Sequence, residues 1–210
     1  RRGAAVHEVK EHSVERFAEQ WPQTLRELGC APDHYLIHSV TPDSPALGDP
    51  ALLDALRDVA DGGTRIGIST SGPHQADVVQ AALKVGVFSS VQSTWNPLEP
   101  SVGPALARAH DAGWFVVVKE AMANGRLVAE DSELARLADS AGVGRDALAL
   151  AGALAQPWAD VVLSGAATAA QLEQNVAALS IDPELAAAID PHLAESPESY
   201  WHNRSQLPWT

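Results

Sequence analysis

The sequence has little cysteine, little positive charge and no long apolar run. A single cysteine, Cys30, excludes an internal disulfide and is typical of a reducing cytoplasm. With 14 lysines and arginines against 27 aspartates and glutamates, the net charge of −13 argues against nucleic acid or an anionic membrane as the main partner. No stretch approaches the roughly 18 apolar residues of a membrane span. The first residues also lack the apolar core of a signal peptide, so we expect a cytoplasmic protein.

Five short apolar runs are the main structural signal in the sequence, and helical patterns separate them. They are Tyr35–Ser39, Arg65–Ser69, Ser90–Thr94, Phe115–Lys119 and Asp160–Ser164. Such runs predict buried parallel strands in β/α units, and therefore an α/β fold of the doubly wound or (β/α)8 TIM-barrel type. No Gly-x-Gly-x-x-Gly follows any run, which counts against the doubly wound Rossmann version.

The helical patterns between and after these runs complete one expected domain, residues 1–210. The expected helices are Ser13–Leu28, Pro50–Ala60, His74–Val85, Gly103–Ala112, Ser132–Ala141, Arg145–Ala155, Ala169–Leu179 and Pro183–Ala194. Pro22 should kink or divide the first of them. The tail holds Trp201 and Trp209, which could close over a substrate or seal one end of the fold.

Each apolar run carries a polar residue at or near its end. These residues are His38, Ser69, Gln92, Lys119 and Ser164. The carboxyl ends of parallel strands build the ligand site in α/β folds, so these side chains should surround one cleft. Lys119 has three interpretations: a salt bridge, a phosphate contact, or a Schiff-base amine. The histidines His7 and His12 lack the i, i+4 spacing of a helical zinc site, and we expect no metal.

The turn after the last run, Gly165–Thr168, could present backbone N–H groups to a phosphate at a helix start. It could equally be an ordinary turn in which Thr168 caps the helix.

Taken in order, these segments resemble the aldo-keto reductase family. The segment Tyr35–Ser39 is similar to the family's fourth strand, whose histidine is catalytic, and the resemblance gives that role to His38. The similarities to the family's fifth and sixth strands assign cofactor contacts. The nicotinamide carboxamide would be held by Ser69, by Thr70 in place of the usual asparagine, and by Gln92.

The resemblance also covers the two phosphate-side segments. For the loop under the pyrophosphate, the resemblance implies cofactor contacts from Lys119, Glu120, Met122, Gly125 and Leu127. Toward the adenine it implies Ser164, Gly165, Ala166, Thr168, Gln171, Gln174 and Asn175. Many members stack an aromatic residue on the nicotinamide where Lys119 stands here.

The resemblance has one large departure. The family barrel has three earlier strands, which carry a catalytic aspartate, tyrosine and lysine, and this chain starts after most of them, with about strands 4–8. Tyr35 is three residues before His38 on one strand and faces the other side, and Tyr200 lies in the tail, so neither is the expected proton donor. Lys10 could end the third strand, although the segment after that strand suits it better.

The resemblance implies an NAD(P)(H)-dependent oxidoreductase that transfers hydride between nicotinamide and a small carbonyl or alcohol substrate. Two alternatives stay open: a class I aldolase or lyase with a Schiff base on Lys119, and a non-catalytic nucleotide-binding protein or fragment. The cofactor is NADP or NAD. The segment 164–179 has no lysine or arginine for a 2′-phosphate, although Arg126 or Arg145 could supply the charge.

An incomplete barrel would also expose unpaired strand edges. We therefore expect a homo-oligomer, or an N-terminal segment beyond these residues, to cover the open edge. The 210 residues alone should be neither a stable monomer nor a catalyst.

Overall fold

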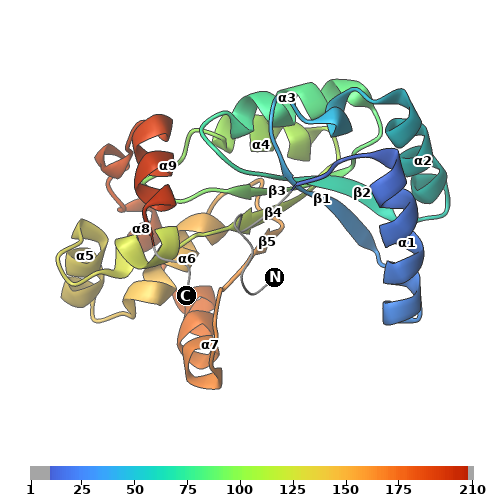
Figure 1. Ribbon diagram of the computed structural model, residues 1–210. Helices are drawn as coiled ribbons and strands as arrows, with labels where there is room; N and C mark the ends of the chain where they lie inside the picture. Colours follow the sequence, from blue (N-terminus) through green and yellow to red (C-terminus); the bar gives the residue numbers. More distant parts are fainter. Residues whose placement is uncertain (1–9, 208–210) are drawn as a thin grey trace.

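Five parallel strands form the centre of the structure, a computed structural model that describes residues 10–207 (Figure 1). The strands are β1 (His34–Val40), β2 (Arg65–Thr70), β3 (Ser90–Thr94), β4 (Phe115–Lys119) and β5 (Val161–Val162). They pair in the order in which they occur in the chain, β1-β2-β3-β4-β5. This confirms the expected α/β fold with a parallel sheet. The expected roles of His7 and Trp209 concern residues outside the described range.

The helices up to residue 187 lie where the sequence predicts them, with shifted ends, and a helix in the tail was not expected. They are α1 (Val14–Leu28), α2 (Pro50–Asp61), α3 (Gln75–Val85), α4 (Gly103–Asp111), α5 (Glu133–Ala141), α6 (Arg145–Leu154), α7 (Ala169–Val176), α8 (Pro183–Ala187) and α9 (Pro197–Ser205). Short 3₁₀ segments are η1 (Pro45–Leu47), η2 (Ala123–Val128), η3 (Ala177–Ser180) and η4 (Pro191–Leu193). Two expected helices are therefore shorter than predicted: α7 passes directly into η3, and residues 188–190 separate α8 from η4.

Helix α1 shows how local sequence sets these ends. The Ser13 hydroxyl accepts a hydrogen bond from the Arg16 amide, and Gly29 ends the helix at φ 74°. The expected division at Pro22 is wrong, because α1 is one helix through that residue. Pro22 and Ala18 are both exposed, so the carbonyl that the proline leaves without a donor can meet water.

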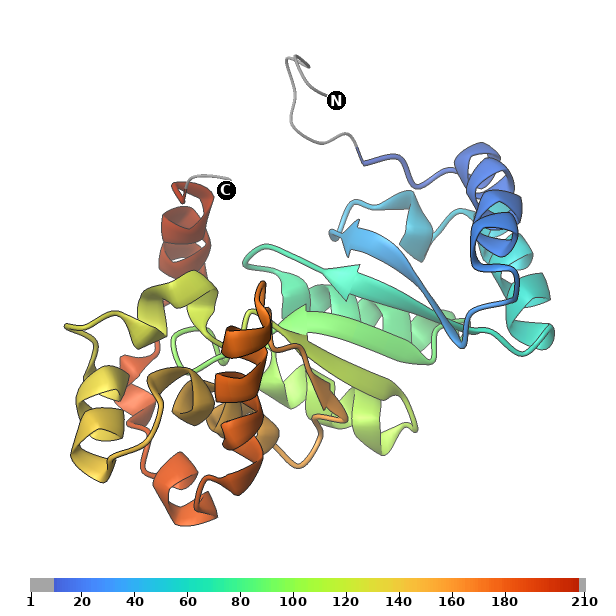
Figure 2. The same cartoon turned by 90° about the horizontal axis from the view of Figure 1, so that it is seen from below.

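The strand register separates an apolar face from a polar one. Ile37, Ile68, Val91 and Val116 form one row across the sheet, and each is at most 9% exposed. Helices α3 and α4 lie over this face, and Figure 2 views the sheet from the opposite side. Because alternate residues of a strand face opposite sides, the row of Ser69, Gln92 and Val117 faces away from these helices. No helix among residues 10–207 has the length and apolar character needed to cross a bilayer.

Candidate functional site

Three polar residues from neighbouring strands meet on the face of the sheet away from α3 and α4. Ser69 on β2 and Gln92 on β3 are register partners, and the Ser69 hydroxyl donates to Oε1 of Gln92 at 3.4 Å. Lys119 at the end of β4 donates from Nζ to the Ser69 Oγ at 3.2 Å. We call Ser69, Gln92 and Lys119 the strand-end cluster. It combines a hydroxyl, an amide and an ammonium group, and Ser69 is only 3% exposed.

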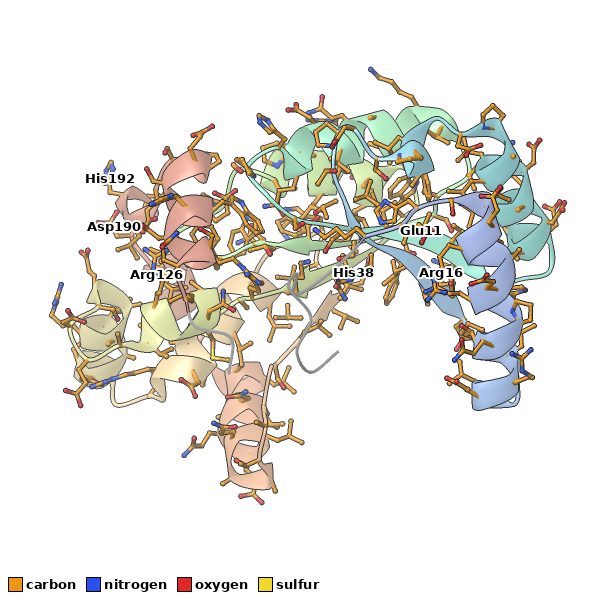
Figure 3. The ribbon with its side chains drawn as sticks, viewed as in Figure 1. Glu11, Arg16, His38, Arg126, Asp190 and His192 are labelled. Carbon is orange, nitrogen blue, oxygen red and sulfur yellow. The ribbon has the colours of Figure 1, made fainter. Side chains whose placement is uncertain are left out.

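His38 lies at the end of the adjoining strand, β1. Ile37, the residue before it, pairs with Ile68, the residue before Ser69, so His38 and the cluster share one end of the sheet. Its side chain is exposed to solvent, and Figure 3 shows it at the centre of the molecule. The structure therefore brings Ser69, Gln92 and Lys119 together and places His38 on the strand next to them.

Thr70 does not join the cluster. It follows Ser69 directly on β2, so its side chain turns to the helix-covered face, where it is fully buried. Its Oγ1 lies 2.6 Å from the Ser93 Oγ and donates to Oε1 of Gln75 at 3.3 Å. The threonine that stands where the family usually has asparagine is thus part of the core, and its side chain points away from that of Ser69.

The loop after β4 is held by helix α9. Glu120, at φ 56°, pairs with Arg204 of α9 at 2.7 Å, and its carbonyl accepts from Asn96 at 3.0 Å. The Arg126 guanidinium forms an ion pair with Glu195 and lies 5.5 Å from the centre of the Tyr200 ring.

The remaining expected residues of this loop differ in their accessibility. Met122 is half-buried, Gly125 has φ 91°, and Leu127 is 2% exposed in the core. Figure 3 places Arg126 well apart from His38. The loop therefore offers a ligand backbone atoms, while its charged side chains already have partners.

The turn into α7 is capped from within. Gln171 accepts through Oε1 from the amides of Ala167 at 2.8 Å and Thr168 at 3.2 Å. Thr168 caps α7 in return by accepting from the Gln171 amide at 3.2 Å. The Ser164 hydroxyl accepts from the Ala166 amide at 3.3 Å. Three amides of this turn, those of Ala166, Ala167 and Thr168, are thus already bonded within the turn itself.

The other expected residues of this segment lie around that turn. Gly165 has φ 66°, and Gln174 is exposed. Asn175 is 4% exposed and donates to the Ser164 carbonyl at 3.0 Å, while its Oδ1 has no hydrogen-bond partner among the described residues.

Neither tyrosine lies at the strand-end cluster. The Tyr35 ring packs edge-on against Trp21 with centroids 5.3 Å apart. Tyr200 is fully buried, and its hydroxyl accepts from Asn96 at 3.0 Å. Burial raises the pKa of Tyr200 to about 12. Lys10 is exposed and outside any helix or strand.

Sequence reasoning missed two buried polar residues on the helix-covered side of the sheet, Gln75 and Glu99. Gln75 is fully buried and donates to the Thr94 carbonyl at 2.8 Å and to Glu99 at 3.4 Å. Glu99 is also fully buried, and its Oε2 has no hydrogen-bond partner among the described residues. Only the tertiary structure brings them together, since 24 positions separate them in the chain.

Parallel β/α units with polar groups gathered at one end of the sheet are the arrangement found in (β/α)8 barrels, where ligand sites lie at the strand ends. The aldo/keto reductase family model matches residues 4–194. The chain therefore belongs to the aldo-keto reductase family, whose known structures are (β/α)8 barrels.

Solved structures give the same result for the fold. A candidate 2,5-diketo-D-gluconic acid reductase B is 28% identical with a TM-score of 0.67, over 86% of this chain and 63% of that one. The aldo-keto reductase AKR11C1 from Bacillus halodurans, in its holo form, is 21% identical with a TM-score of 0.68, over 92% and 68%. The thermostable aldo-keto reductase Tm1743 with the inhibitor epalrestat is 20% identical with a TM-score of 0.65, over 90% and 67%.

The chain thus spans about two thirds of the length of these structures, and 63% in the case of the first. A comparison with curated proteins gives no match.

Proposed function

We propose that the protein is an NAD(P)(H)-dependent oxidoreductase that transfers hydride between a nicotinamide nucleotide and a small carbonyl or alcohol substrate. The observation that carries the proposal is the strand-end cluster. Ser69 and Gln92 share one row of the sheet, and the Lys119 Nζ donates a hydrogen bond to the Ser69 Oγ at 3.2 Å. Membership of a family of reductases supports the reaction class.

The cluster fits the carboxamide of a nicotinamide. That group has a carbonyl oxygen, which accepts hydrogen bonds, and an NH2 group, which donates them. A serine hydroxyl and a glutamine amide can each both donate to the oxygen and accept from the NH2 group. Nε2 of Gln92 makes no hydrogen bond within residues 10–207, so it can donate to the carboxamide oxygen. The phosphate side fits less directly, because Gln171 already occupies the amides of Ala167 and Thr168. We propose that the nucleotide lies across the cluster, the loop 121–127 and the segment 165–175.

His38 would act on the substrate. When bound, the reduced nicotinamide supplies a hydride, with its electron pair, to the carbonyl carbon. A hydrogen bond from the His38 imidazole orients the carbonyl and stabilises the negative charge that develops on its oxygen. Tyr35 and Tyr200 both lie in packed surroundings, so we assign the final proton on the oxygen to neither of them. We propose that it comes from the segment or second copy that completes the barrel.

The test is a nucleotide titration. NADH and NADPH are titrated against the wild type, Gln92→Ala and the control Gln23→Ala, in which an exposed glutamine of α1 is removed. The titration follows protein fluorescence, and the same three proteins are assayed for carbonyl reduction. Loss of one or two hydrogen bonds should weaken binding by Gln92→Ala about fivefold to tenfold. Equal affinities in all three proteins would remove Gln92 from the site.

For the cofactor, we propose that NADPH has no strong advantage over NADH. A 2′-phosphate needs an accessible arginine or lysine. Arg126 already pairs with Glu195, and Arg145 pairs with Asp139 at 2.8 Å. The same titration measures the ratio of the two affinities, and a ratio above about 100 in favour of NADPH would overturn this choice.

We also propose that the 210-residue chain self-associates in a reducing, cytoplasmic environment, where Cys30 stays an exposed free thiol. Within the described residues, β1 and β5 have no strand on their outer edges. Apolar side chains beyond β5 are exposed as well, with Leu172 at 51% and Leu179 at 75%. Sedimentation velocity at several concentrations tests this, and a stable monomer throughout would contradict it.

A further inference from the structure

The end of β1 is irregular at the residue to which the proposed function assigns substrate contact. Ile37 pairs with Ile68 and Val40 with Thr70, so three steps along β1 match two along β2. His38 and Ser39 fill the extra step, and Ser39 adopts φ 51°. A bulge of this kind re-aims a side chain, and the pairing of the two strands does not fix it. Some other contact has to hold the backbone of His38.

His12 supplies that contact from the segment before α1. Its Nε2 lies 2.8 Å from the carbonyl oxygen of His38, and its Nδ1 lies 2.6 Å from the hydroxyl of Ser44. A carbonyl can only accept, so Nε2 carries the proton. In the neutral imidazole Nδ1 then accepts from Ser44, whose oxygen accepts in turn from the Ala46 amide at 3.2 Å.

This chain of hydrogen bonds runs in one direction and ends in the core. Ser44 is 9% exposed and Ala46 is fully buried, so the inner end of the chain is fixed. The outer end holds the carbonyl next to the residue with positive φ. His12 thus connects the segment before α1, the end of β1 and the turn of η1 at one point.

We propose that His12 is a positioning residue for His38: by binding the His38 carbonyl it fixes the bulge of β1, and with it the direction in which the His38 imidazole meets the substrate carbonyl. The proposal rests on the proposed function for the role of His38. The hydrogen-bonded bulge does not depend on that role. His12 itself makes no contact with substrate or nucleotide in this proposal.

Two substitutions of His12 separate positioning from simple packing. His12→Leu removes both hydrogen bonds, whereas His12→Gln keeps an amide N–H that can reach the His38 carbonyl. Ser44→Ala removes the inner link and leaves His12 in place. His192→Leu is the control, because His192 is exposed on η4, remote from β1 (Figure 3).

Two readouts are needed. The first is NMR of the His38 imidazole and of the Ser39 amide in each variant. We expect shifted or broadened signals in His12→Leu, recovery in His12→Gln, and no change in His192→Leu. The second is carbonyl reduction. Misplacing a group by about 1 Å can cost 100-fold, so kcat should fall about tenfold to 100-fold in His12→Leu, with nucleotide affinity within twofold of the wild type.

A failure of the positioning role of His12 and a failure of the proposed function give different results. If the wild type reduces no carbonyl compound, the proposed function fails, and the NMR arm alone decides whether His12 holds the bulge. Unchanged His38 and Ser39 signals in His12→Leu would overturn the inference, as would an unchanged kcat in an active enzyme. If His12→Leu does not fold, Ser44→Ala is judged by the same two readouts.

Discussion

The Nζ atom of Lys119 lies 3.2 Å from the Oγ atom of Ser69, across the intervening strand β3. Neighbouring strands are about 4.8 Å apart, so only a long side chain can connect β4 with β2. The ammonium group therefore supports the hydroxyl that donates to Gln92. This geometry favours an electrostatic role for Lys119 in holding the cluster.

The first prediction concerns Lys119→Met, which keeps the length of the side chain and removes its charge. A hydrogen bond from a charged group contributes about 1.5 kcal/mol or more, so the affinity for NADH or NADPH should fall about tenfold. Lys84→Met, on the exposed end of α3, is the control and should bind as the wild type does. Borohydride trapping with a carbonyl compound should give no adduct on Lys119, and a trapped adduct would instead favour the Schiff-base alternative.

The second prediction concerns Gly67, which lies in β2 between Leu36 and Ser90. A Cβ there would overlap the Ser90 Oγ and would stand 2.6 Å from the Ser90 carbonyl oxygen. The backbone of Ser90 cannot move aside without a cost in free energy, so Gly67→Ala should lower the free energy of unfolding by about 1–3 kcal/mol. Gly48→Ala is the matched control, since nothing lies within 4 Å of its Cβ position. Urea unfolding measures both, and equal midpoints would contradict the close packing of this row.

How much the sequence could predict depends on how far apart in the chain the interacting residues lie. The strands and the helix caps follow from local patterns, and Ser13 and Gly29 bound α1 as expected. The register that joins Ser69 with Gln92 follows from strand alternation once the strands are paired. The opposite orientation of Thr70 follows from the same alternation, yet the family pattern pointed the other way.

Contacts between distant segments could not be predicted. Arg204 meets Glu120 across 84 positions, and His12 meets His38 across 26, with no periodic signal to connect them. Such pairs arise only after the core has brought α9 and the segment before α1 to the sheet. The resemblance assigned Glu120 to the cofactor, and Arg126 was a candidate for the charge at a 2′-phosphate. Their partners, Arg204 and Glu195, are remote in the chain and gave no local signal.

The third prediction concerns the ion pair between Glu120 and Arg204. The two side chains are 15% and 28% exposed, so solvent screens this pair less than a surface pair. A double-mutant cycle with Glu120→Gln and Arg204→Met should give a coupling energy of about 1–3 kcal/mol. The same cycle on Arg16 and Glu19, which are 43% and 71% exposed, should give about 0.5 kcal/mol or less. Similar values for the two pairs would mean that α9 is not held to the loop by this contact.

The last prediction concerns the pH dependence of stability at Glu99. Burial raises the pKa of Glu99, and the negative charges of Glu198 and Glu195 raise it further, against the hydrogen bonds from Ser101 and Gln75 that lower it. A raised folded-state pKa means that the contribution of Glu99 to stability is fully present below the unfolded pKa. It is lost as the pH rises through the folded pKa.

Replacing Glu99 by glutamine removes this titration. The stability of Glu99→Gln relative to the wild type should therefore increase from pH 4 to pH 7, as measured by urea unfolding at each pH. Asp139→Asn is a control of opposite sign. Arg145 holds the pKa of Asp139 below its usual range, so the contribution of Asp139 is present above the unfolded pKa and is lost as the pH falls. That variant should be less stable than the wild type at pH 7 and should approach it at acid pH. If the stability of Glu99→Gln relative to the wild type instead decreases from pH 4 to pH 7, Glu99 is ionised in the folded protein without penalty. Its buried Oε2 atom then has a hydrogen-bond donor that the described side chains do not provide.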